Sequence, residues 1–239
     1  MKTFVILLAA LLSTGTLFAQ AGRNAKEARQ NTKARATNAS QLERDTQELA
    51  DFRAKLIELE AAFTAKDKAA AAALRTQLLA DMEREIAQSE RKIGQDRREV
   101  SQSKAEAKAS GRELQRSRAE RATPGGDAKD ARDVRDDRRD RADDRRDTQD
   151  DRRDLTAQRA RTARQKEILA AIRAEKFDVK APGKQKALTQ KALVQEFAVT
   201  MEADLAATRA EIAEDKRESR EDRRERQEDR REAGERVKR

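Results

Sequence analysis

Carboxylate pairs next to arginines are the residues of this chain whose types and spacing could do chemistry. The block Asp-Asp-Arg-Arg-Asp repeats every seven residues across 136–154, and a glutamate-rich version repeats across 214–232. Paired carboxylates can act as general acid and base, or can bind a divalent cation. In this chain the arginines beside them oppose cation binding, and exposed carboxylates should ionise normally. The blocks therefore indicate charge pairing between helices rather than catalysis.

The composition removes the side chains that most often carry catalysis and metal binding. The chain contains no histidine and no cysteine, which excludes zinc ligation and histidine-based catalysis in their usual forms. Gly94 and Gly111 are isolated, and Gly125-Gly126 reads as a turn, so no phosphate-binding glycine loop is present. We therefore expect a protein that is not an enzyme and has no catalytic residue, no cofactor and no metal site.

The seven-residue period of the charged blocks corresponds to two turns of an α-helix and predicts heptad-organised helices. Within each block the first, second and fifth positions form an acidic face, and the third and fourth form a basic face. These faces are candidate interaction surfaces. Their representative residues are Asp137, Arg138, Asp144, Arg145, Asp151, Arg152, Asp222, Arg223, Asp229 and Arg230.

The heptad frame also predicts how the charged helices, here called the arms, should associate. Antiparallel pairing would bring acidic rows against acidic rows and arginine rows against arginine rows, whereas parallel pairing would bring acid against arginine. We therefore expect the arms not to pair tightly with their immediate hairpin partners. They should associate, if at all, in parallel with a diagonal arm or with an arm of a second molecule.

The first residues have the pattern of a secretory signal peptide. Lys2 precedes an apolar run over 4–12, and small residues follow up to Ala21. The run is too short for a membrane span. We expect cleavage after Ala19 or Ala21 and a mature chain in the periplasm or the medium, without a transmembrane span.

Charge and composition limit the choice of partners. Charged residues make up 42% of the chain and the formal net charge is +9. Acids and bases nevertheless alternate along the sequence, since 129–154 holds ten basic and eleven acidic residues. A nucleic-acid binder should show a basic stripe and aromatic stacking residues, yet Trp and Tyr are absent. We expect a protein partner or self-association through the arms, and no specific nucleic acid.

Apolar periodicity predicts an all-α fold with four long helices, near 40–62, 66–120, 127–176 and 185–233. We expect two antiparallel hairpins whose apolar residues form a four-helix core near the turns at Phe63 and Phe177, with charged helical arms projecting from it. The expected order is a signal peptide (1–21), a basic arm (22–39), hairpin 1 (40–122), a turn (123–126) and hairpin 2 (127–239), with charged heptad segments at 127–154 and 214–233. The expected core residues are Leu56, Leu59, Leu78, Met82, Ile172, Phe197, Met201 and Leu205.

Three functions fit this sequence. The first is a non-enzymatic, exported coiled-coil protein with a structural or protein-interaction role in the bacterial envelope. The second is a periplasmic chaperone or stress adaptor of the small helical type. The third is a hydrophilic desiccation or stress protectant, because so charged a composition borders on that of disordered chains.

Overall fold

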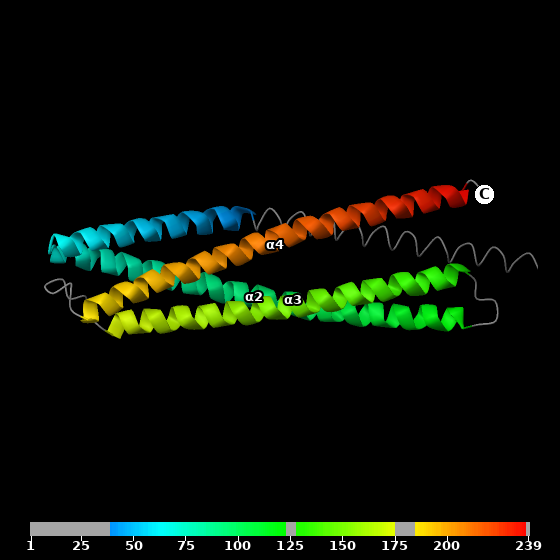
Figure 1. The fold of residues 1–239 in the computed structure, drawn as a ribbon, viewed down its shortest axis with the longest axis horizontal. Helices are drawn as coiled ribbons and strands as arrows, with labels where there is room; N and C mark the ends of the chain where they lie inside the picture. The colour runs from blue at the N-terminus through cyan, green and yellow to red at the C-terminus, as the bar shows by residue number, and fades with distance from the viewer. Residues whose placement is uncertain (1–38, 123–127, 175–184, 238–239) are drawn as a thin grey trace, which may run out of the picture. The chain divides into compact units, whose positions relative to one another are not determined.

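The computed structural model describes residues 39–122, 128–174 and 185–237, and these residues form four α-helices and no strand. The first helix covers residues 39–64. It is followed by α2 (Lys68–Arg121), α3 (Ala128–Ala174) and α4 (Gln185–Val237), as Figure 1 shows. The all-α expectation is confirmed. The expected signal peptide, most of the basic arm, the turn at 123–126 and Phe177 lie outside the described residues.

Contacts divide the chain into two compact units. Residues 49–204 form one unit, which contains most of the first helix, all of α2 and α3, and the first part of α4. The other unit combines the described residues before Leu49 with those from Leu205 onward. The charged blocks are divided accordingly, since the Asp-rich block belongs to the first unit and the Glu-rich block to the second.

A tight turn connects the first helix to α2. Lys66 adopts a left-handed backbone with φ of 57°. Its N–H donates to the Phe63 carbonyl and the Asp67 N–H donates to the Ala62 carbonyl, which is the Schellman arrangement that ends a helix. The Asp67 carboxylate then accepts from the N–H groups of Ala69 and Ala70 at 3.0 Å and caps α2. The chain can therefore reverse within three residues.

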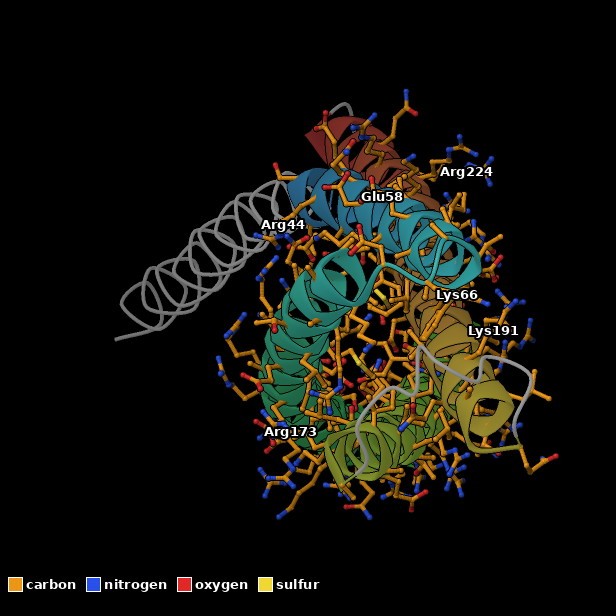
Figure 2. All side chains as sticks on the ribbon, turned by 90° about the vertical axis from the view of Figure 1, so that its left-hand side faces the viewer. Arg44, Glu58, Lys66, Arg173, Lys191 and Arg224 are labelled. Carbon is orange, nitrogen blue, oxygen red and sulfur yellow. The ribbon has the colours of Figure 1, made fainter. Side chains whose placement is uncertain are left out.

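Residues 49–204 form an antiparallel four-helix bundle. Ion pairs join the first helix to α2 (Lys55–Asp81, 2.5 Å), α2 to α3 (Lys166–Glu90, 2.5 Å) and the first helix to α4 (Lys191–Glu60, 2.7 Å). The last two pairs are about half exposed and add specificity more than stability, whereas Lys55–Asp81 is mostly buried. Figure 2 shows Arg173 and Lys191 pointing outward from helices that surround a filled interior.

The core of this unit contains residues that helical periodicity picks out. Seven of the eight expected core residues belong to this unit, and all of them but the half-buried Leu56 are buried. The eighth, Leu205, belongs to the other unit and is buried as well. Phe52 and Phe197 are fully buried, and their ring centroids lie 5.6 Å apart in a tilted arrangement. Phe63 is half-buried beside a small hollow between the first helix and α4. The position of the core near the Phe63 turn therefore agrees with the sequence.

Candidate interaction surface

A ladder of hydrogen bonds joins α2 to the Asp-rich part of α3. The Ser117 hydroxyl donates to Asp137, and the Ser110 hydroxyl donates to Asp144. Ser103 continues this register opposite Asp151 and lowers its pKa, while the Ser103 hydroxyl donates to the Val100 carbonyl at 3.4 Å. Both partners advance by seven residues per rung in opposite directions, so one register repeats along the two helices. The same register continues into the bundle, where Ser89 donates to the Gln165 amide oxygen at 3.2 Å.

A thin apolar row accompanies the ladder. Val100 and Leu114 of α2 are buried, as are Val134 and Leu155 of α3. Serine is small and lets the two helix backbones approach, and its hydroxyl satisfies a carboxylate that would otherwise lose water without compensation. Rungs and apolar row together make residues 96–121 and 134–158 a two-helix ribbon, here called the α2–α3 ribbon (Figure 1).

The expectation that the Asp-rich arm would remain unpaired, or associate only in parallel, is wrong. Its helix packs antiparallel against α2 along the α2–α3 ribbon. The charge argument considered helices that carry the same block, but α2 carries serine where the block has its second aspartate. Serine donates a hydrogen bond to the carboxylate instead of repelling it. Repulsion between like charges is confined to the rows beside the seam, which is the contact line formed by the ladder and the apolar row.

The predicted interaction residues separate into two environments. Asp137, Asp144 and Asp151 are partly buried against α2 and hold the ladder. Their arginine neighbours in the sequence are exposed: Arg138, Arg145 and Arg152. In the Glu-rich block Arg223 is exposed. The side chains of Asp222, Asp229 and Arg230 lie outside the described residues, although their backbone belongs to α4.

Acidic residues gather along one side of the ladder, and the pKa values of Asp147 and Asp151 are raised there. Burial raises the pKa of Asp147, and the neighbouring carboxylates of Asp144 and Asp151 raise it further. Burial also raises the pKa of Asp151, its bond with Ser103 lowers it, and the charges of Asp154 and Glu106 raise it again. The contribution of Glu106 comes from α2, so acids of both helices share this side.

These shifts predict an unusual pH dependence. An aspartate whose folded pKa exceeds its ordinary value of 3.8 favours the folded state most below that value. This contribution is lost as the pH rises through the folded pKa. Replacing Asp147 and Asp151 by asparagine should therefore raise the free energy of unfolding at pH 7, and the gain should disappear near pH 3. Chemical unfolding monitored by circular dichroism at both pH values measures this difference.

The matched control for this experiment is Asp136→Asn. Asp136 is exposed and forms an ion pair with Arg139 at 3.7 Å. Its replacement should change stability by less than about 0.5 kcal/mol. A double asparagine variant that is less stable than the parent at pH 7, or equally stabilised at both pH values, would contradict the expected electrostatic strain.

A second polar cluster lies inside the bundle, and the sequence pattern did not predict it. The Asp204 carboxylate of α4 accepts from Arg161 Nε at 2.6 Å, from Gln165 Nε2 at 3.1 Å and from Ser89 Oγ at 3.4 Å. Arg161 also donates to the Gln158 side chain at 2.6 Å. Gln165 is fully buried and Ser89 nearly so. The cluster therefore ties together three helices through groups that ordinarily face water.

A second ion pair connects α3 to α4 at the surface. Arg164 donates from Nε and a terminal nitrogen to the two oxygens of Glu196, at 2.6 and 2.8 Å. The bonds to Glu196 raise the pKa of Arg164, and the same bonds lower the pKa of Glu196. The bidentate geometry fixes the rotation of α3 relative to the first part of α4.

Two further properties bear on the expected chemistry. Among the described residues no group of acidic side chains has the arrangement of a metal site. None of the described helices contains an apolar stretch long enough to cross a lipid bilayer.

Comparison with known proteins adds no relative to this picture. No family model matches the chain, and no curated protein or solved structure is significantly similar to it.

Proposed function

We propose that this chain is a non-enzymatic, exported helical protein with a structural or protein-interaction role in the bacterial envelope. The observation that carries the proposal is the repeated Ser–Asp register between α2 and α3. Polar residues that would be costly to bury alone are used here at fixed spacing to hold two long helices together. Such a ribbon displays charged rows at regular intervals, as an interaction surface requires.

The interior packing supports this function over that of a protectant that folds only on drying. Phe52, Phe197 and Met82 are fully buried, and burial of this kind stabilises a fold in dilute solution. Circular dichroism of the purified chain in dilute buffer should show high helicity that is lost in one cooperative thermal transition. Weak helicity that rises only on dehydration would favour the protectant instead.

Export is tested separately. N-terminal sequencing of the protein recovered from a bacterial envelope fraction should give Gln20 or Gly22 as the first residue, because the leader ends in small residues. Recovery of a chain that still begins with Met1 from the cytoplasm would contradict export, without bearing on the helical ribbon.

A chaperone role is the second candidate, and exposed apolar side chains favour it. Ile57 is 70% exposed, Val199 59% and Leu188 50%. Exposed apolar groups can hold unfolded clients, although scattered ones also occur on proteins without that role. Suppression of client aggregation that is lost in an Ile57→Ser, Val199→Ser variant would favour the chaperone, and a stable protein without this activity would favour the structural role.

A further inference from the structure

On the outer surface of the α2–α3 pair, one row of positions repeats every seven residues on both helices. The charge of this row changes halfway along the helices. Within the bundle the row holds acid against base, because Glu83 pairs with Arg173 and Glu90 pairs with Lys166. Each further step is seven residues up α2 and seven residues down α3. The charged residues of the row are exposed along its whole length, and Gly111 is half-buried, so what changes along the row is the sign of the charge.

Beyond the bundle the same row contains cations on both helices. The next two steps of seven residues place Arg97 of α2 opposite Arg159 of α3, and Lys104 opposite Arg152. Each such pair of opposite positions is called a level. The next step pairs Arg145 of α3 with Gly111 of α2 by sequence position, although the side chain nearest to Gly111 is that of Arg141. The last step brings in one arginine from each helix: Arg118 and Arg138. Within the described part of the chain, none of these seven cations forms a hydrogen bond or ion pair. We call this set the basic row.

The residues next to the basic row add no acid. On α2 the flanking positions are Gly94, Ser101, Lys108 and Gln115, and on α3 they are Arg135, Ala142, Gln149 and Thr156. The acids of the block lie elsewhere, in the ladder, beside Glu106 on the other side of the seam, or paired with a separate line of arginines. Folding thus divides the basic face that the sequence predicts: the fourth-position arginines of the block are paired with aspartates, and the third-position arginines share a face with cations of α2.

The paired arginines provide the contrast. Arg139, Arg146 and Arg153 are also seven residues apart on α3 and also exposed. Each forms an ion pair with the aspartate three residues earlier, at 3.7, 2.9 and 2.7 Å. Two lines of arginines on one helix therefore differ in whether the protein neutralises them, and of these two lines the one in the basic row is left for an external anion.

The geometry of the basic row selects among anionic partners. Its levels are about 10.5 Å apart, and the row extends over about 31 Å, since each residue rises about 1.5 Å. Two helices side by side place the cations on a flat face. The strands of a DNA duplex wind around its axis once in about 34 Å, so a straight row of cations of this length would meet phosphates at only a few points. A planar anionic surface meets every level at once. No aromatic residue lies in the row to stack on single-stranded bases.

We propose that the basic row docks this protein on an anionic lipid surface. The flanking residues are small or polar, so contact is peripheral and electrostatic rather than by insertion. This attachment goes beyond the structural role proposed above and does not depend on export.

Vesicle sedimentation with the full chain tests this attachment. The protein should sediment with vesicles of phosphatidylcholine and phosphatidylglycerol in equal parts, but not with phosphatidylcholine alone. Binding should fall steeply between about 0.1 M and about 1 M salt, as the Debye length shortens from about 10 Å to about 3 Å. Insertion of the apolar residues 4–12 would instead bind both kinds of vesicle and resist salt.

Two variants with the same change in net charge locate the surface. Replacing Arg138, Arg145 and Arg152 by glutamine should weaken binding to the anionic vesicles by at least about tenfold. The control replaces Arg139, Arg146 and Arg153 by glutamine and should weaken binding by less than about threefold, with circular dichroism showing that both variants remain helical.

Three results would overturn the proposal. The first is equal loss of binding in the two variants, which would indicate a response to net charge alone. The second is binding to duplex DNA at equal phosphate concentration that matches or exceeds vesicle binding. The third is salt-sensitive self-association without vesicles that the basic-row variant alone abolishes, since this would identify a second copy as the partner.

Discussion

Replacing Phe197 by alanine should lower the free energy of unfolding of residues 49–204 by about 3–5 kcal/mol. The ring is fully buried and packs on Phe52 across the bundle, so its removal loses apolar burial and leaves a cavity that long helices cannot easily close. In a unit of this size about 1 kcal/mol corresponds to 2–4 °C in melting temperature. Thermal and urea unfolding followed at 222 nm measure the change.

The control for the Phe197 variant is Val199→Ala in the same helix. Val199 is 59% exposed, and its truncation should cost less than about 0.5 kcal/mol. The double variant Phe52→Ala, Phe197→Ala should cost less than the sum of the single variants, because the two rings share one contact. Similar losses from Phe197→Ala and Val199→Ala would show that the aromatic pair is not the centre of the core.

Replacing Asp204 by alanine should cost about 3 kcal/mol, the lower end of the range for breaking a buried ion pair. The Arg161 and Asp204 side chains are 20% and 13% exposed. Removing the carboxylate takes from the Arg161 guanidinium its anionic partner, leaves the buried Gln165 amide without this acceptor, and takes from the Ser89 hydroxyl one of its two acceptors. The control is Glu202→Ala. Glu202 lies two residues before Asp204 in α4, and its replacement removes an ion pair with Arg53. That pair is about half exposed, so its loss should cost no more than about 1 kcal/mol.

A double variant separates the worth of the Arg161–Asp204 pair from the penalty of breaking it. Arg161→Met combined with Asp204→Leu removes both charges and keeps apolar bulk, and it should recover most of the stability lost in Asp204→Ala. A double variant as unstable as Asp204→Ala would mean that the hydrogen bonds to Gln165 and Ser89 carry the stabilisation. An Asp204→Ala variant no weaker than Glu202→Ala would mean that water reaches the cluster freely.

The predictable part of this fold depends on apolar periodicity. Residues such as Leu78, Met82 and Ile172 recur at helical spacing, and the structure buries them together. α2 ends at Arg121, shortly before Pro124 and Gly125 in the sequence, as expected from residue types that disfavour a helix through the backbone itself. Such signals are local, and one sequence is enough to read them.

The polar interior could not be predicted in the same way. Ser89, Gln165 and Asp204 are polar residues on three helices, and their positions become a cluster only when the relative rotation of those helices is known. The ladder did leave a trace, since Ser103, Ser110 and Ser117 share the spacing of Asp137, Asp144 and Asp151. Detecting it required comparing the two periods across the turn.

The charge argument about pairing failed for a related reason. It considered the rows beside the seam correctly, because Glu106 of α2 does raise the pKa of Asp151. It omitted the seam itself, where hydroxyl groups answer carboxylates and apolar residues exclude water. Repulsion between half-exposed groups is worth tenths of a kcal/mol, which burial of Leu114 alone can exceed.

Because the Ser–Asp register repeats every seven residues on both helices, the ribbon could be shortened or lengthened by whole heptads. Removing seven residues from α2 and seven from the facing part of α3 would take out one rung and leave every other partner in register. The ribbon would shorten by about 10.5 Å per such step. Selection can therefore change the length of the α2–α3 ribbon in whole heptads while the Ser–Asp register is kept.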